Sequence, residues 1–134
     1  MASKQVICDT DILIDYFDVR QKRHEQTKRI IEQVIGLENI LISSITKMEL
    51  LIGATNKEDL KIIDKSLKRF GVILINPEIN LTAISIAYEY RLSHGLALAD
   101  AMIAATSIQT DLELFTYNTK DFKFIKNLSL FKFD

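Results

Sequence analysis

Residues 6–17, VICDTDILIDYF, join a short apolar run to an abrupt cluster of acidic and polar residues. The apolar run that ends at Cys8 is too short for a core helix and is typical of a buried strand. Thr10 and Asp11 favour the start of a helix, which the following apolar residues can continue. We therefore expect Asp9 at the carboxyl end of the first strand, where open α/β sheets place their functional sites.

An acidic residue at this position has two interpretations. Asp9 or Asp11 caps the following helix, which is the commoner role of an isolated Asp-Thr-Asp. Alternatively, Asp9 binds a hard divalent cation such as Mg²⁺ or Mn²⁺, which prefers carboxylate oxygens.

The composition excludes several classes of protein. The chain has 134 residues, the usual size of one domain, and a hydrophobic fraction of 48%, which is enough for a core. The formal net charge of −1 argues against bulk electrostatic binding of nucleic acid, although a local basic rim remains possible. The single cysteine, Cys8, excludes an internal disulfide and a cysteine-based zinc site.

The sequence also gives no sign of membrane association. No apolar run approaches the roughly 20 residues that a spanning helix needs. The first residues, MASKQ, lack the basic and then apolar layout of a signal peptide. We expect a soluble, cytoplasmic protein that does not bind membranes.

Apolar runs alternate with helical patterns along the whole chain. Residues 39–43, 72–75 and 112–116 are predicted strands, and residues 128–133 form a further candidate edge strand. The pattern predicts a single α/β domain over residues 1–134. Its expected architecture is three-layer α/β/α, with a central, mainly parallel sheet of four to five strands.

Further acidic residues fall near the ends of these strands. Glu49 lies in the first turns of a helix, although Thr46-x-x-Glu49 also fits a capping box. Asp100 begins an alanine-rich helix, where the helix dipole alone also favours an acid. Asn118 and Asp121 follow the last of the three later strands.

Strand-to-helix turns of a parallel sheet share one edge, so these acids are expected to converge. Carboxylates at close range raise each other's pKa, and a divalent metal removes that penalty. Carboxylates around Mg²⁺ or Mn²⁺ are the usual equipment for phosphodiester hydrolysis. No nucleophile competes, because His24 and His94 have no serine or thiolate partner in a convincing context.

Four segments together resemble the PIN-domain family, and within it the VapC-type toxin ribonucleases of type II toxin–antitoxin systems. They occur in the family's order and span nearly the whole chain: ICDTDILID (7–15), ISSITKMELLIG (42–53), ALADAMIAATSI (97–108) and LELFTYNTKDF (112–122).

The resemblance implies roles for individual residues. Asp9, Glu49 and Asp100 match the family's acidic metal-binding and catalytic residues. The fourth acidic position falls on Asn118 or Asp121, and Asn118 brings a carbonyl oxygen but no charge. Asp11 stands where many members have asparagine, so it tunes Asp9 or contacts a water. Thr10, between the two aspartates, is a further candidate.

The resemblance also implies an activity and partners. A VapC-type protein is a Mg²⁺- or Mn²⁺-dependent endoribonuclease that cuts tRNA, rRNA or mRNA. Members form homodimers, and a cognate antitoxin protein inhibits them by inserting a segment into the acidic groove. Apolar residues that surround the predicted helices at residues 12–17 and 45–52 independently favour a partner.

Three alternatives stay open. A catalytically weak PIN-like module that binds RNA or protein is favoured by Asn118. The Asp9-x-Asp11 spacing also begins aspartate-based phosphatases of the haloacid-dehalogenase type, which need a larger core. A receiver-type signalling domain needs an aspartate after its third strand, where this chain has Asn76-Pro77.

Overall fold

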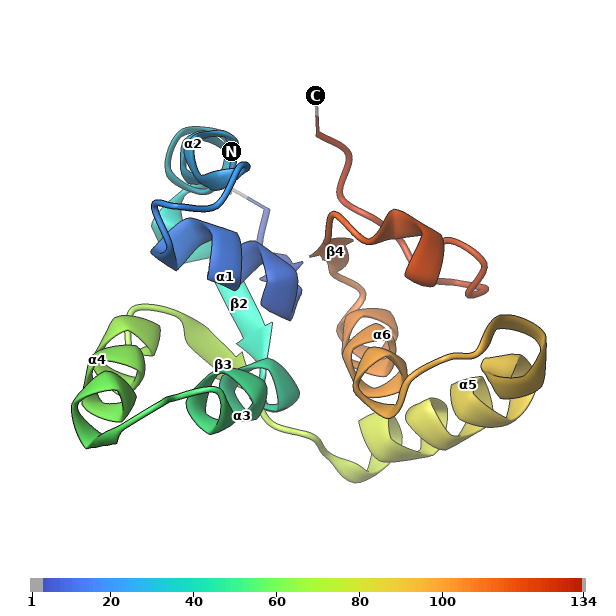
Figure 1. The fold of residues 1–134 in the computed structure, drawn as a ribbon. Coiled ribbons are helices and arrows are strands. Elements are labelled where there is room, and N and C mark those ends of the chain that lie inside the picture. The colour runs from blue at the N-terminus through green and yellow to red at the C-terminus, as the bar shows by residue number, and fades with distance from the viewer. Residues whose placement is uncertain (1–3, 134) are drawn as a thin grey trace.

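Strand β1 (Val6–Cys8) lies inside a parallel sheet, as predicted. The computed structural model describes residues 4–133 (Figure 1). Its sheet has four strands in the order β3-β2-β1-β4, and every pairing is parallel. The other strands are β2 (Ile40–Ser43), β3 (Gly71–Ile73) and β4 (Glu113–Phe115).

Successive residues of β1 are buried on opposite faces of the sheet. Val6 and Cys8 pack in one hydrophobic cluster, and Ile7 packs in another. A strand that is covered on both faces has to be apolar at consecutive positions, which is what the sequence of β1 shows.

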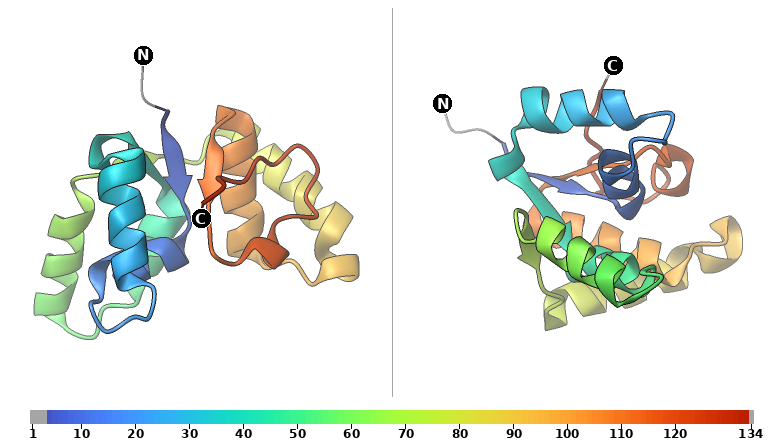
Figure 2. Two further views of the ribbon diagram at one scale, coloured as in Figure 1. Left: turned by 90° about the horizontal axis from the view of Figure 1, so that it is seen from above. Right: turned by 60° about the vertical axis from the view of Figure 1, so that its left-hand side comes forward.

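Helices cover both faces and produce three layers, which confirms the predicted α/β/α fold. One face is covered by α1 (Thr10–Phe17), α2 (His24–Arg29), the π-helix η1 (Ile30–Ile35) and α4 (Lys57–Leu67). The other is covered by α5 (Pro77–His94) and α6 (Leu98–Thr110). The left-hand view of Figure 2 shows α5 and α6 on one side of the sheet and α1, α2 and α4 on the other.

The remaining elements connect these layers. Helix α3 (Ser44–Ile52) follows β2 directly and contacts both α1 and α6. Two 3₁₀ turns, η2 (Leu37–Asn39) and η3 (Thr119–Asp121), precede β2 and follow β4. Thus each strand leads into helical structure at the same edge of the sheet, directly or after a short connection.

One helix is irregular, and one prediction differs from the structure. Helix α2 gives way to π-helical backbone before Gly36, which has a φ of +95°. The predicted edge strand at residues 128–133 is reduced to a single bridge between Leu114 and Leu130.

The corner between α5 and α6 decides where α6 begins. Gly95 ends α5 with a φ of +65°, in the left-handed region that favours glycine. The Arg91 guanidinium donates to the carbonyl oxygens of Gly95 and Leu96, both at 3.1 Å. This corner returns the chain so that the first turn of α6, with Asp100, faces the carboxyl edge of the sheet.

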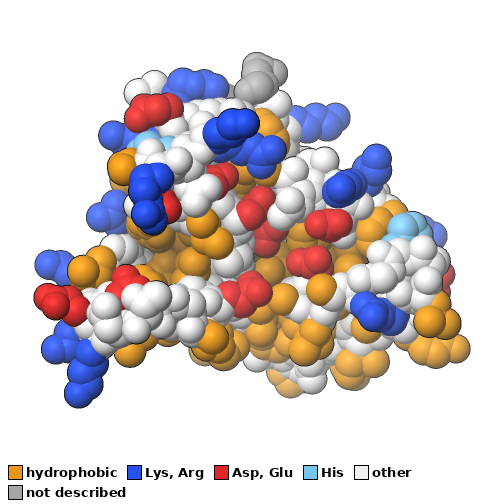
Figure 3. All heavy atoms as spheres, in the orientation of Figure 1, with side chains coloured by type: hydrophobic (Ala, Val, Ile, Leu, Met, Phe, Trp, Pro, Cys, Tyr) orange, Lys and Arg blue, Asp and Glu red, His pale blue; other side chains and the backbone are white. Residues whose placement is uncertain are grey.

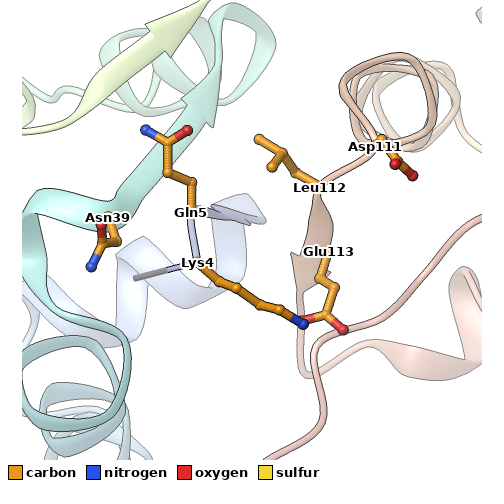
Figure 4. Close-up of a pocket in the computed structure, with 6 residues that line it drawn as sticks. All are labelled: Lys4, Gln5, Asn39, Asp111, Leu112 and Glu113. Carbon is orange, nitrogen blue, oxygen red and sulfur yellow. The ribbon is translucent and has the colours of Figure 1, made fainter. Parts of the chain in front are cut away.

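The opposite edge of the sheet is also hollowed. A hollow of about 400 Å³ lies there, at the amino ends of β1 and β4, and Figure 4 shows Lys4 and Glu113 among its lining side chains. Within residues 4–133, no helix is long and apolar enough to span a membrane.

Candidate active site

Asp9 is held from two sides at the end of β1. Its side chain is almost fully buried, at 5% exposure. The Oδ1 atom accepts a hydrogen bond from the Thr10 backbone N–H at 2.8 Å and so caps α1. The Oδ2 atom accepts a hydrogen bond from Thr116 Oγ1 at 2.8 Å. The capping interpretation of Asp9 is therefore confirmed, but it accounts for only one carboxylate oxygen.

Thr116 is the residue that the sequence analysis missed. The parallel pairing of Cys8 with Phe115 places the next residues, Asp9 and Thr116, beside each other. Thr116 also accepts a hydrogen bond from the Asn118 backbone N–H at 3.0 Å. The register of the first and last strands was the signal that could have identified it.

Asp11 links α1 to the turn after β4. Its Oδ2 atom accepts a hydrogen bond from the Tyr117 backbone N–H at 3.1 Å. Its Oδ1 atom is buried and has no hydrogen-bond partner within residues 4–133. A buried carboxylate oxygen without a partner is rare in proteins, which makes a bound water or cation its natural complement.

Glu49 is fastened to α1 rather than to its own helix. The N-cap of α3 is Ser43, whose hydroxyl accepts a hydrogen bond from the Ile45 N–H at 3.1 Å. Glu49 Oε1 instead accepts a hydrogen bond from Thr10 Oγ1 at 2.6 Å. The capping-box interpretation of Thr46 and Glu49 is wrong, because Ser43 occupies the cap three residues earlier than that box requires.

Asp100 lies in the first turn of α6, where no side chain caps the helix. Burial raises its pKa, and the charges of Asp9, Asp121 and Glu49 act in the same direction, so that together they raise it to about 6. The structure thus brings together, at one edge of the sheet, carboxylates that are far apart in sequence. Its position in the first turn also agrees with the helix-dipole interpretation.

The fourth position is occupied by two exposed residues. Asp121 ends η3 and lies close enough to Asp100 to act on its pKa. Asn118 precedes η3 and contributes its backbone N–H to Thr116, while its side chain makes no capping hydrogen bond. Electrostatically, Asp121 belongs to the cluster, whereas Asn118 supports the geometry around Asp9.

The two remaining aspartates are also hard to ionise. Burial raises the pKa of Asp9, and the Glu49 charge adds to this, against hydrogen bonds from Thr116 and Thr10 that lower it. Burial and the Asp9 charge raise the pKa of Asp11 to about 7. The pKa of each aspartate is therefore raised by burial and by neighbouring negative charge, with no lysine or arginine offsetting it.

The surface shows the same separation of charge. Figure 3 shows acidic side chains gathered at the centre of one face, with lysine and arginine side chains at its margins. In the described part of the chain, the ion pairs of lysine and arginine lie elsewhere, at Arg20–Asp18 and Lys68–Asp64. Among residues 4–133, no lysine or arginine forms an ion pair with the central acids.

The cluster fits a hard divalent cation in its donor chemistry. All its side-chain donors are oxygens, which suit Mg²⁺ and Mn²⁺, and Asp11 supplies an unpartnered one. Between residues 4 and 133, however, no three acidic, histidine or cysteine side chains are already positioned to hold an ion. Glu49 and Asp121 are exposed, so their rotamers can adjust within nanoseconds.

Comparison with known proteins agrees with this architecture. The profile of the PIN domain matches residues 6–127. Ribonuclease VapC1 of Methanocaldococcus jannaschii is 29% identical over 132 residues, which cover 97% of this chain and 88% of the relative. Ribonuclease VapC19 of Mycobacterium tuberculosis is 29% identical over 125 residues, or 91% and 95% of the two chains.

A solved structure gives the same result. A chain of a toxin–antitoxin complex from Klebsiella pneumoniae is 32% identical, with a TM-score of 0.73 over 92% of this chain and 95% of that one. A chain of DNA-bound VapBC from Salmonella typhimurium, 22% identical, shares the fold with a TM-score of 0.78, covering 96% and 97% of the two chains. The chain therefore belongs to the PIN-domain family and is of the VapC type.

Proposed function

We propose that this protein is a metal-dependent endoribonuclease and the toxin of a toxin–antitoxin pair. The observation that carries the proposal is the cluster of Asp9, Glu49, Asp100 and Asp121 at the carboxyl edge of the sheet, in which buried Asp9 and half-buried Asp100 have raised pKa values. The relatives named ribonucleases support the reaction, and the toxin–antitoxin complex supports the biological role.

Each residue has a part in this proposal. Asp9, Glu49 and Asp100 hold Mg²⁺ or Mn²⁺, and Asp121 completes the site in preference to the uncharged Asn118. When bound, the cation activates a water for attack on phosphorus and neutralises charge on the phosphate. Thr10, which donates to Glu49, sets the direction of that carboxylate.

Thr116 and Asp11 have supporting roles, because they contact Asp9 and the turn after β4. Thr116 orients the Asp9 carboxylate and favours its ionised form by donating to Oδ2. Asp11 holds the turn after β4 against α1 through the Tyr117 N–H. Together they determine how closely Asp121 can approach the other acids.

The direct test is cleavage of labelled RNA by the purified protein with Mg²⁺, Mn²⁺ or EDTA. We expect cleavage with either metal and none with EDTA. Asp100→Asn should abolish cleavage because it removes a charge from the cluster. A folded Asp100→Asn protein that cuts at the wild-type rate would refute the assignment.

Asp111→Asn is the matched control for this test. Asp111 is exposed at the other end of α6, with a φ of +57°, a conformation that asparagine adopts readily. The same chemical change there should leave cleavage unchanged. If wild type binds RNA but does not cleave it with any metal, the protein is instead a PIN-like binding module.

The antitoxin is expected to occupy an apolar groove beside the acids. This groove, about 510 Å³, lies between α1, α3 and α4, and Thr10 and Glu49 form part of its wall. Ile14 and Phe17 line it with 44% and 38% of their surface exposed. An apolar antitoxin segment that carries a basic side chain would cover the groove and neutralise the negative charge of the acids beside it.

Ile14→Asp tests this partner without touching the acids. It should abolish inhibition by the antitoxin encoded beside the gene, while metal-dependent cleavage continues. Full inhibition of the variant would exclude the groove.

A second apolar surface supports homodimers. Leu81, Ile84, Tyr88 and Leu92 are exposed along one side of α5 at helical spacing. A stripe of this kind is self-complementary when two copies meet across a twofold axis. Leu81→Asp with Tyr88→Asp should convert a dimer into a monomer in sedimentation analysis, and an unchanged mass would disprove this interface.

The substrate is proposed to be tRNA, rRNA or mRNA, with the whole chain acting as one nuclease domain in the cytoplasm. Mapping the ends of RNA fragments after expression in cells identifies which RNA is cut.

A further inference from the structure

Three aromatic side chains form a cluster beside the candidate active site. The imidazole of His94 stacks on the ring of Phe124, with centroids 3.9 Å apart and planes at 13°. Tyr90 packs against both rings at a steep angle, with centroid distances of 5.8 Å to His94 and 5.1 Å to Phe124. His94 is exposed even though Phe124 stacks on one face of its imidazole.

The cluster is held in place by hydrogen bonds at its edges. Ser93 Oγ lies 2.7 Å from Nδ1 of His94 and fixes the imidazole. The Lys126 backbone N–H donates to the Tyr90 hydroxyl at 3.1 Å, which joins the segment after η3 to α5. An exposed ring that is fixed in this way loses little conformational freedom when a flat ligand stacks on it.

The segment that carries Phe124 also presents positive charge. Phe122 and Ile125 are buried and anchor it to the core. Lys120, Lys123 and Lys126 are exposed before, between and after these two anchors.

This aromatic surface lies close to the acids. Phe124 is three residues after Asp121 in the chain, so their Cα atoms are at most about 11 Å apart. Asp121 itself acts on the pKa of Asp100. A ligand whose reacting group is bound at the acids can therefore reach the cluster.

We propose that the exposed face of His94, backed by Phe124, stacks against a nucleobase of the RNA substrate, while Lys123 and Lys126 contact the adjoining phosphates. This inference rests on the proposed ribonuclease function. It makes the region a binding subsite for single-stranded RNA, because only an unpaired base offers its flat face to a side chain.

The combination of groups favours RNA over a protein partner at this surface. A stacked pair of flat rings flanked by lysines matches the alternation of bases and phosphates in a single strand. The two surfaces assigned to protein partners, on α1 and on the outer side of α5, each carry one aromatic side chain, Phe17 or Tyr88, among aliphatic ones, and neither has a stacked pair of rings among the described residues.

Binding is measured in the Asp100→Asn protein, which does not cut, by fluorescence anisotropy with a labelled single-stranded RNA of mixed sequence. Adding His94→Ala should weaken binding about tenfold, within the range that stacking on one side chain contributes. His94→Phe should restore binding because it keeps a flat ring. His94→Lys should not, because it adds charge without a ring.

An RNA series with single abasic positions makes the test specific. At the RNA position that stacks on His94, removing the base and removing the imidazole should have effects on the binding free energy that are not additive. In the cleaving protein, His94→Ala should raise KM more than it lowers kcat.

The outcomes separate this inference from the function beneath it. If wild type cleaves RNA, but adding His94→Ala to the Asp100→Asn protein leaves RNA binding unchanged, the stacking proposal is wrong and the ribonuclease proposal is unaffected. If only His94→Lys restored RNA binding, charge and not stacking would explain the effect. If His94→Ala weakened antitoxin binding but left RNA binding unchanged, the surface would be a protein-binding site. If wild type cleaves no RNA in any metal, the ribonuclease proposal fails first.

Discussion

Replacing Thr116 with valine tests how the fold prepares Asp9. The substitution keeps the shape of the buried side chain but removes its hydroxyl, and with it two hydrogen bonds. One is the bond donated to the Asp9 carboxylate at 2.8 Å, and the other is accepted from the Asn118 N–H at 3.0 Å. A hydrogen bond to a charged group contributes about 1.5–3 kcal/mol, and a neutral one contributes about 0.5–1.5 kcal/mol.

The net cost of Thr116→Val should lie near the lower end of the sum of these two contributions. Asp9 keeps its hydrogen bond from Thr10, and the N–H of exposed Asn118 can turn to water. We expect a loss of about 2 kcal/mol in the free energy of unfolding. For 134 residues this corresponds to a fall in Tm of about 7 °C.

The same change should shift the pH dependence of activity. The Thr116 hydrogen bond lowers the pKa of Asp9, so its loss raises that pKa further. Asp9 then stays protonated to a higher pH, and the acidic limb of the cleavage profile should move to higher pH. At alkaline pH the rate should approach that of wild type.

Thermal melts and cleavage rates measured across pH provide the assay, with Thr116→Ser as the matched control. Serine keeps the hydroxyl and should retain the wild-type pH profile. A Thr116→Val protein with the wild-type Tm and acidic limb would show that this hydrogen bond does not prepare Asp9.

Three further perturbations have defined outcomes. Burial and like charge raise the pKa of Asp100 to about 6 and of Asp11 to about 7, so the metal-free protein should lose their stabilising contribution as the pH rises from about 4 through about 7. Mg²⁺ should therefore raise Tm more at about pH 8 than at about pH 5, and equal shifts at both would contradict a site among these carboxylates. Gly36→Ala should lower the unfolding free energy by about 1–2 kcal/mol in urea titration, because the φ of +95° at this residue disfavours a Cβ. Gly53→Ala, at a φ of −73°, serves as its control and should be nearly neutral. Phe122→Ala should cost about 3–5 kcal/mol in the same titration, because Phe122 is 1% exposed and anchors the turn beside Asp121; a loss below 1 kcal/mol would contradict that anchoring role.

The sheet could be predicted because its strands have a simple local signature. Val6–Cys8 and residues 40–42 are short, continuously apolar runs followed by the cap residues Asp9 and Ser43, so their type and their edge follow from the chain itself. Asp9 could be placed near the ends of later strands without knowing the order of the strands, because the connections of a parallel sheet return to the same edge.

The errors arise where local patterns compete. Ser43 and Thr46 are both good cap residues, and the structure uses Ser43, which frees Glu49 to reach Thr10 on another helix. Nothing in the sequence of residues 30–35 distinguishes π-helical from α-helical backbone. The partner of Asp9 was missed because Thr116 is 107 residues away, and only the pairing of the first and last strands brings them together.

That pairing has a consequence for synthesis of the protein. Strand β4 is the last of the sheet and lies directly against β1. A ribosome that has completed four fifths of the chain has produced Asp9, Glu49 and Asp100 but not the threonine that steadies Asp9 or the turn that carries Asp121. Under the proposed ribonuclease function, the acidic edge is therefore completed only after β4 and the turn that follows it have been synthesised.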